Sequence, residues 1–107
     1  MDKLATLSCS EQVEKLNHEQ ILKLEEHVPQ WNAIELQNLE RDFEFQDFKK
    51  AIDFINEVAL IAESENHHPE IKLHGWNKIK INLTTQKVSG LTKNDFILAA
   101  KINELED

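Results

Sequence analysis

The stretch Asp47–Pro69, DFKKAIDFINEVALIAESENHHP, carries the strongest secondary-structure signal in the chain. It opens with an aspartate, a common helix N-cap, and it closes with Pro69, which disfavours helical geometry at His68. Between them, apolar residues recur at intervals of three and four, as on one face of a helix: Phe48, Ala51, Ile52, Ile55, Val58, Ala59 and Ala62. The sequence therefore predicts a long helix that ends at about Asn66 and leaves His67 and His68 at its C-terminal exit.

On both sides of this helix the apolar period changes to two, which is typical of half-buried strands. Turns are expected near Gln37–Asn38 on the N-terminal side and near Gly75–Asn77 on the C-terminal side. The pattern predicts two antiparallel hairpins, and their apolar positions are Ile34, Leu36, Phe43 and Phe45 in the first and Ile71, Leu73, Ile79, Ile81 and Leu83 in the second.

Two further helices begin with the pattern of a capping box. Asn17 and Gln20 open a short helix that ends before Pro29, and Thr92 and Asp95 open the last one. The apolar positions of this last helix are Phe96, Ala99, Ala100 and Ile102. Helices and strands that each have one apolar side pack best as two layers. We therefore expect an α+β fold, a four-stranded antiparallel sheet with three helices packed on one face, in the order α-β-β-α-β-β-α.

The length and charge of the chain restrict the class of protein. We expect a single domain over residues 1–107, with residues 1–16 as a candidate flexible arm. A net charge of -8 disfavours binding to nucleic acid or to an anionic membrane. The single cysteine cannot form an internal disulfide, which fits a reducing compartment. Because neither a secretory signal nor a membrane span is recognisable, a soluble, cytoplasmic protein is expected.

The adjacent histidines admit several interpretations. A helix C-terminus stabilises an imidazolium, and the extended backbone before Pro69 sends the two rings in different directions, so both could exchange protons with one bound molecule. A histidine pair without further context is more often a solvated feature of a helix exit. No metal site is expected at His67, His68 and His74, because their spacing matches no zinc pattern. Nucleophilic catalysis has less support, because Cys9 lies in the candidate arm and the sequence contains no Gly-x-Ser-x-Gly elbow.

A dispersed set of residues narrows these alternatives. Its members follow one another along the chain as Glu63, His67, His68, Pro69, Trp76 and Asp95. In this order and spacing they resemble the signature of the pterin-4a-carbinolamine dehydratases, also called 4a-hydroxytetrahydrobiopterin dehydratases. The resemblance begins at about His18 and includes the stretches VPQW, FEFQDFKKAIDFINEVALIAE and GLTKNDFILAAKI. It therefore covers nearly the whole chain after the arm.

The resemblance implies an enzyme, a hydro-lyase that removes water from 4a-hydroxytetrahydropterin. The product is the quinonoid dihydropterin, an intermediate of tetrahydrobiopterin recycling. The resemblance implies no metal and no cofactor, and it assigns proton transfer to His67 and His68, with the acid and base roles open between them. It also implies a set of residues that bind the pterin substrate or orient the histidines: Trp31, Glu63, Pro69, Thr85, Gln86 and Asp95.

Three of these residues also have a structural interpretation. Trp31 could be a core aromatic at the start of a strand. Asp95 stands where a capping box requires an acidic residue, so a capping role is expected whatever else it does. Glu63 could belong to the solvated side of the long helix. The functional and the structural interpretations therefore stay open together at these positions.

One residue departs from the family pattern. Gln86 stands where the family has a third histidine or a tryptophan. An amide can hydrogen-bond a pterin, but it cannot accept and return a proton at neutral pH. The alternative hypothesis is therefore a catalytically weak or inactive member that acts as a protein-binding or assembly factor. Because the family commonly joins sheet edges, and exposed edges tend to be paired, a homodimer or homotetramer is expected.

Overall fold

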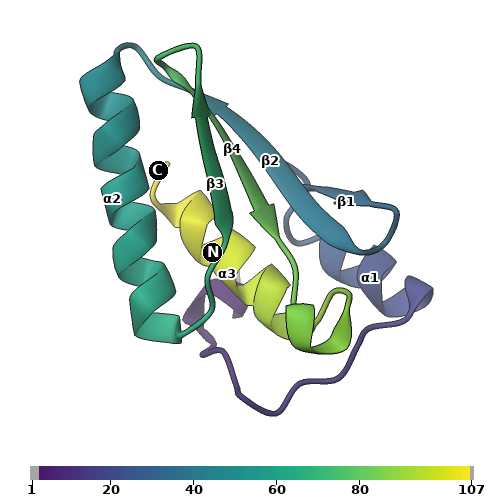
Figure 1. The fold of residues 1–107 in the computed structure, drawn as a ribbon. Coiled ribbons are helices and arrows are strands. Elements are labelled where there is room, and N and C mark those ends of the chain that lie inside the picture. Colours follow the sequence, from purple (N-terminus) through teal and green to yellow (C-terminus); the bar gives the residue numbers. More distant parts are fainter. Residues whose placement is uncertain (1–2, 107) are drawn as a thin grey trace.

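The computed structural model of the protein describes residues 3–106. Its helices and strands follow the predicted order α-β-β-α-β-β-α, and Figure 1 shows their arrangement. They are α1 (His18–Glu25), β1 (Asn32–Ile34), β2 (Asn38–Glu44), α2 (Phe48–Glu65), β3 (Glu70–His74), β4 (Lys78–Leu83) and α3 (Lys93–Glu104), with two short 3₁₀ helices, η1 (Lys3–Thr6) and η2 (Gln86–Val88). The predicted caps form: the side chains of Asn17 and Asp47 accept hydrogen bonds from the N–H groups of Gln20 and Lys50.

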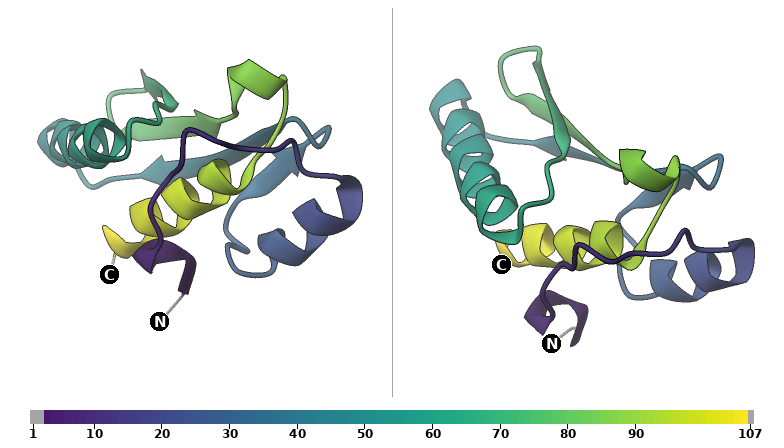
Figure 2. Two further views of the ribbon diagram at one scale, coloured as in Figure 1. Left: turned by 90° about the horizontal axis from the view of Figure 1, so that it is seen from below. Right: turned by 60° about the horizontal axis from the view of Figure 1, so that its bottom comes forward.

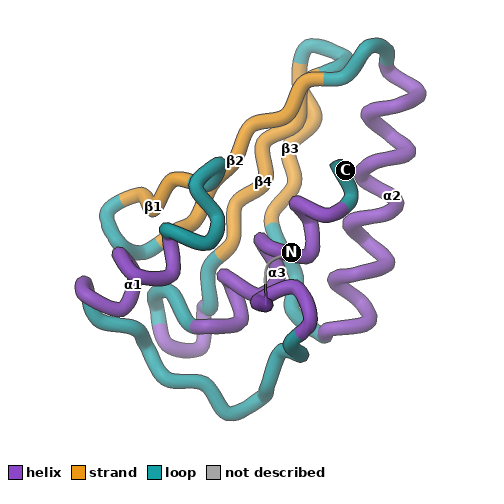
Figure 3. The backbone as a smooth tube through the Cα atoms, turned by 180° about the vertical axis from the view of Figure 1, so that it is seen from behind, coloured by secondary structure: helices purple, strands orange, loops and turns teal. Residues whose placement is uncertain are grey.

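The strands form one antiparallel sheet in the order β1-β2-β4-β3. Figure 3 shows them side by side in this order. Each predicted hairpin supplies one edge strand and one central strand, and the hairpins join between β2 and β4. Alternate residues of the central strands are buried, namely Leu39, Phe43, Ile79, Ile81 and Leu83. The opposite face of the sheet is polar, with Glu40, Asp42, Lys78, Lys80 and Asn82.

The three helices cover one face of the sheet, as predicted (Figure 2). α3 lies beneath the strands, with α1 on one side of it and α2 on the other. Because η1 also packs on α3, this helix is enclosed, and all its residues from Asn94 to Ala100 are buried. The first turn of α3 therefore places polar side chains in the interior. Within residues 3–106, no helix has the length and the apolar composition required to cross a lipid bilayer.

The predicted inward face of α2 was wrong in part. The buried residues of this helix are Ala51, Phe54, Val58 and Ala62. Phe48 and Ala59, both predicted to be inward, are exposed. α2 is apolar on more than one side, so residue spacing alone allows two faces. Aromatic packing selects one of them, since the ring centroid of Phe54 lies 4.8 Å from that of Phe43 and 4.9 Å from that of Phe45.

The first hairpin turns earlier than predicted. Glu35 and Leu36 have φ values of 51° and 61°, and the N–H of Gln37 donates to the carbonyl of Ile34 at 3.0 Å. Two successive left-handed residues close a tight hairpin turn, so Leu36 belongs to the turn and not to the strand. Residues with a side chain rarely adopt this conformation, and the sequence therefore gives no turn signal here. Leu39 occupies the inward position on β2 instead.

Residues 3–16, named here the N-terminal strap, lead from η1, which packs on α3, to the beginning of α1 (Figure 1). Ala5 is buried, and its carbonyl accepts a hydrogen bond from Nζ of Lys101 at 2.8 Å. The N–H of Ser10 donates to Oδ1 of Asn94 at 2.9 Å, and Nδ2 of Asn94 donates to the carbonyl of Ser10 at 2.7 Å. The segment considered as an arm thus contacts α3 at two places, the first turn of the helix and its last turn.

Candidate functional site

The histidine pair lies where α2 ends and β3 begins. Asn66 caps α2 in a left-handed conformation, with φ 54° and ψ 40°, and the N–H of His67 donates to the carbonyl of Ala62 at 3.2 Å. The helix therefore ends where the sequence predicts, and β3 begins directly after Pro69. The side chain of His67 is 12% exposed and that of His68 is 56% exposed. This short connection thus directs one ring inward and the other toward solvent.

His67 contacts the first turn of α3. Its Nε2 lies 2.6 Å from Oδ1 of Asp95, which is fully buried. Oδ2 of Asp95 accepts from the hydroxyl of Thr85 and from the N–H of Thr92, each at 2.9 Å, and the two threonine hydroxyls are 2.8 Å apart. A carboxylate only accepts hydrogen bonds, so Nε2 of His67 donates to Asp95. Nδ1 of His67 is then the ring nitrogen that can exchange a proton with a bound molecule.

Two predicted roles of Asp95 coincide in this network. The bond from the N–H of Thr92 is the capping interaction that the sequence predicts for α3. The bond from His67 comes to the other oxygen of the same carboxylate. Capping α3 and orienting the ring of His67 therefore do not compete, because each uses its own oxygen.

His68 forms a second pair, with Glu63 of α2. Its Nε2 lies 2.5 Å from Oε2 of Glu63, whose side chain is 76% exposed. Water and salt weaken an exposed pair of this kind, so Glu63 holds its ring less firmly than Asp95 holds His67. The rings of His67 and His68 thus meet carboxylates on different elements, in agreement with the different directions expected for them.

Trp31 lies in the core. It is buried, its Nε1 donates to Oδ1 of Asn103 at 2.7 Å, and its ring meets that of Phe43 edge-on at 6.2 Å between centroids. Nη1 of Arg41 donates to the same oxygen of Asn103 at 2.6 Å, and burial lowers the pKa of Arg41. Asn103 lies about two turns beyond Asp95 along α3. The structure therefore does not bring Trp31 to the histidines, and its burial favours the core interpretation.

Gln86 begins η2, directly after Thr85. Thr85 is buried and donates to Asp95, whereas Gln86 is exposed. Gln86 lines a small cavity of about 330 Å³, together with Gln37, Asn38, Thr84 and Ser89. Neither His67 nor His68 belongs to this lining. Gln86 is therefore one residue away from the network around His67, while its side chain faces a different space.

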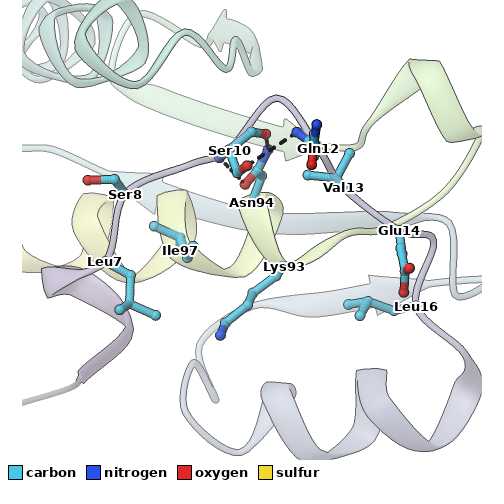
Figure 4. Close-up of a pocket in the computed structure, with 10 residues that line it drawn as sticks. All are labelled: Leu7, Ser8, Ser10, Gln12, Val13, Glu14, Leu16, Lys93, Asn94 and Ile97. Atoms are coloured by element: carbon cyan, nitrogen blue, oxygen red, sulfur yellow. Dashed lines mark hydrogen bonds between the residues drawn. The ribbon is translucent and has the colours of Figure 1, made fainter.

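A cavity of about 720 Å³ lies between the N-terminal strap and the first turn of α3. Figure 4 shows Lys93 and Asn94 approaching it from α3, and Val13 and Leu16 from the strap. The histidine pair does not line it. In the part of the chain that the structure describes, His, Cys, Asp and Glu side chains do not gather in threes where a metal ion could bind. The groups brought together at the histidines are thus two imidazoles and two carboxylates.

Glu65 was not predicted as part of the site. It is the last residue of α2, and its side chain contacts the strap and α3. A signal was present in the sequence, because a glutamate in the last turn of a helix opposes the helix dipole and needs a compensating partner. Which partner compensates it could not be predicted, since Cys9 and Lys101 are both far from Glu65 in the chain.

The comparisons with known proteins agree with this arrangement. Residues 14–105 match the family model described as "Pterin 4 alpha carbinolamine dehydratase". The chain belongs to the pterin-4-alpha-carbinolamine dehydratase family. The resemblance stated from the sequence is confirmed, and so is the prediction of a hydro-lyase family.

Relatives within the family cover most of the chain. A protein of Rubrobacter xylanophilus is 39% identical to this chain over 97 residues, which are 91% of this chain and 90% of that protein. Its name assigns it provisionally to the pterin-4-alpha-carbinolamine dehydratases. The "Pterin-4-alpha-carbinolamine dehydratase 2, mitochondrial" of Arabidopsis thaliana is 56% identical over 68 residues, 64% of this chain and 36% of that protein. A crystal structure titled "transcriptional coactivator/pterin dehydratase", from Brucella melitensis, superposes with a TM-score of 0.81 at 27% identity and covers 88% of this chain and 100% of that one.

Proposed function

We propose that the protein is a pterin-4a-carbinolamine dehydratase that eliminates water from 4a-hydroxytetrahydropterin and yields the quinonoid dihydropterin for tetrahydrobiopterin recycling. The observation that carries the proposal is the contact of 2.6 Å between His67 and Asp95, in a chain of this family. A buried carboxylate fixes the tautomer and the direction of an imidazole. A second imidazole, His68, follows directly. Two such rings can serve as general acid and general base.

The elimination needs one proton delivered and one removed. The C4a–O bond breaks as a general acid protonates the departing hydroxyl, which leaves as water. A general base takes the proton of N5 as the N5=C4a double bond forms. We assign these steps jointly to His67 and His68, so that one ring gives a proton to the departing hydroxyl while the other ring takes the proton of N5. Because His68 is largely exposed, exchange with solvent can restore the starting protonation states.

The other predicted site residues take different parts in this proposal. Glu63 and Asp95 orient the two rings, and Thr85 holds Asp95. The substrate approaches from the exposed side of the histidine pair, which Glu63 and Pro69 border. Asp95 and Thr85 are buried and act through His67. Gln86 binds only the far rim of the pterin, from the side of the cavity that it lines. Trp31 does not touch the substrate and supports the site through the packing of the core.

Turnover of chemically generated carbinolamine by the purified protein tests the proposal. His67→Ala and His68→Ala should each lower kcat by about 10²–10⁴-fold, the usual contribution of a general acid or base. His74→Ala, at an exposed histidine of β3, is the matched control and should leave kcat unchanged. Gln86→His should raise kcat by adding a third proton-transfer group. A wild-type protein without activity above the spontaneous rate contradicts the proposal.

A second candidate function is that of a protein-binding or assembly factor with weak or no catalysis. Two points favour it: Gln86 stands where the resemblance implies a third histidine or a tryptophan, and the similar structure from Brucella melitensis is titled a transcriptional coactivator as well as a pterin dehydratase. The same assay separates the two functions. If the wild-type protein, His68→Ala and Gln86→His all lack activity, the binding function is supported.

We also propose that the protein is a cytoplasmic homodimer or homotetramer that binds neither nucleic acid nor membranes. β1 and β3 are the edges of the sheet, and edge strands present unpaired N–H and C=O groups. β3 has five residues and β1 has three, so β3 offers the longer edge for pairing between copies. The free thiol of Cys9 fits a reducing compartment. Light scattering that detects only a monomer at micromolar concentration contradicts the assembly.

A further inference from the structure

The N-terminal strap bridges the two elements that carry the pair formed by His67 and Asp95. Glu65 stands two residues before His67, at the end of α2. Asn94 stands directly before Asp95, in the first turn of α3, and forms two hydrogen bonds with the backbone of Ser10. The strap is thus bonded to a residue close to each partner of the pair.

Glu65 connects the strap, α2 and α3. Its Oε1 accepts a hydrogen bond from the N–H of Cys9 at 2.8 Å, and its Oε2 lies 3.6 Å from Nζ of Lys101 in α3. Both side chains of this ion pair are largely shielded from solvent. Nζ of Lys101 in turn donates to the carbonyl of Ala5. One carboxylate therefore ties the end of α2 to two other segments, two residues before a proposed catalytic ring.

The position of Glu65 is unfavourable by local rules. The C-terminus of a helix carries partial negative charge, so an acidic residue there is destabilising, and the last turn of α2 contains no basic residue to compensate it. The compensation comes instead from Lys101 and from the N–H of Cys9. Departures from local preference that tertiary contacts compensate are expected mainly at functional sites.

We propose that Glu65 is a positioning residue for His67. By holding the last turn of α2 against α3 and the strap, it keeps the ring of His67 within hydrogen-bond distance of Asp95 and thereby fixes the direction of Nδ1. Displacements of about 1 Å at a reacting group can cost about 10²-fold in rate, so a contact outside the reaction centre can affect turnover. The kinetic part of this inference rests on the proposed dehydratase function.

Two substitutions separate the contacts of Glu65. Glu65→Gln keeps an oxygen for the N–H of Cys9 but removes the charge that faces Lys101, and Glu65→Ala removes both. We expect kcat to fall about threefold in Glu65→Gln and about tenfold in Glu65→Ala, less than the loss of an acid or base residue, with KM within about twofold of wild type. Glu57→Gln, at an exposed glutamate of the same helix, is the matched control and should change neither constant.

Nitrogen NMR of the histidine rings tests the inference without turnover. The hydrogen bond to Asp95 should slow the exchange of the Nε2 proton of His67 with water. In Glu65→Ala this exchange should quicken about tenfold, because the bonded arrangement opens more often. In Glu57→Gln it should remain as in the wild-type protein. A purely structural role of Glu65 would lower the unfolding temperature without this local change.

The outcomes are distinguishable. If the wild-type protein shows no dehydratase activity, the proposed function fails, and the exchange measurement still decides the role of Glu65. If folded Glu65→Ala retains both the kcat and the slow ring proton of the wild-type protein, the positioning role is overturned. If Glu65→Ala does not fold, kcat and the exchange of the His67 ring proton are measured on the nearly isosteric Glu65→Gln. Values equal to those of the wild-type protein would then overturn the positioning role.

Discussion

His67 and His68 are adjacent in the chain, and each has its Nε2 against a carboxylate, yet their surroundings differ. Asp95 is fully buried and also binds two threonines, whereas Glu63 is 76% exposed. Solvent and salt screen the exposed pair, while the buried carboxylate acts in a low dielectric and has all its partners fixed. Two contacts of the same chemistry are therefore unequal in strength, and burial is the cause.

The largest effect expected from this difference is on catalysis. Asp95→Asn keeps an oxygen for Thr85 and Thr92, but its amide N–H then faces Nε2 of His67 and forces the proton onto Nδ1. A reversed tautomer should lower kcat by about 10²–10⁴-fold. Steady-state kinetics of the purified variant checks this. Glu63→Gln, the matched change at the exposed pair, should lower kcat by about twofold at most. Equal losses in the two variants would show that burial does not distinguish the pairs.

The second expected effect is on stability. Asp95→Ala leaves the buried donors of His67, Thr85 and Thr92 without their acceptor, and the free energy of unfolding should fall by about 3–5 kcal/mol. Urea denaturation followed by circular dichroism measures it. Glu63→Ala removes an exposed carboxylate and should change the same quantity by about 0.5 kcal/mol or less. A stability loss below about 1 kcal/mol in Asp95→Ala would refute the strength assigned to the buried network.

The smallest effect concerns Cys9, which lies beside Glu65. Burial, reinforced by the charge of Glu65, raises the pKa of the Cys9 thiol from 9.0 to about 12. The thiolate fraction of Cys9 is then about 10³-fold lower than that of a free thiol. Because a thiolate of higher pKa is the stronger nucleophile, part of this loss is recovered. Alkylation of native Cys9 by iodoacetamide at about pH 8 should therefore be about thirtyfold slower than alkylation of the unfolded protein. Mass spectrometry of the native and the urea-unfolded protein compares the rates.

The same pKa gives the sign of a pH effect. The folded-state pKa of Cys9 lies above the unfolded value of 9.0, so the contribution of the neutral thiol to stability is present below pH 9 and is lost as the pH rises toward 12. Glu65→Gln removes one cause of the raised pKa and should speed the alkylation of the native protein. A native thiol that reacts as fast as the unfolded one would show that this region is open to solvent.

Most of the fold could be predicted because its signals are local. Caps at Asn17 and Asp47, and the proline that ends the long helix, act on neighbouring backbone groups. The turn at Glu35 and Leu36 could not be predicted, since left-handed residues other than glycine leave no mark in the sequence. The inward place of Phe54 also depended on packing, because α2 is apolar on more than one side.

The candidate site could be predicted in its residues better than in its contacts. The resemblance to the dehydratase family indicated His67, His68 and Asp95, and the structure brings Asp95 to one ring of the pair. Trp31 and Gln86 followed from the same resemblance, but one is in the core and the other lines a separate cavity. A pattern along the chain orders residues without stating which way each side chain points.

By itself, the sequence determined the succession of helices and strands and the placing of two imidazoles at a helix exit, because caps, periodicity and proline act over a few residues. Only the tertiary structure decided that His67 meets Asp95 and that Glu65 meets the N-terminal strap. These contacts join residues far apart in the chain. They form only where packed elements bring side chains within hydrogen-bond distance, and no local preference encodes that distance.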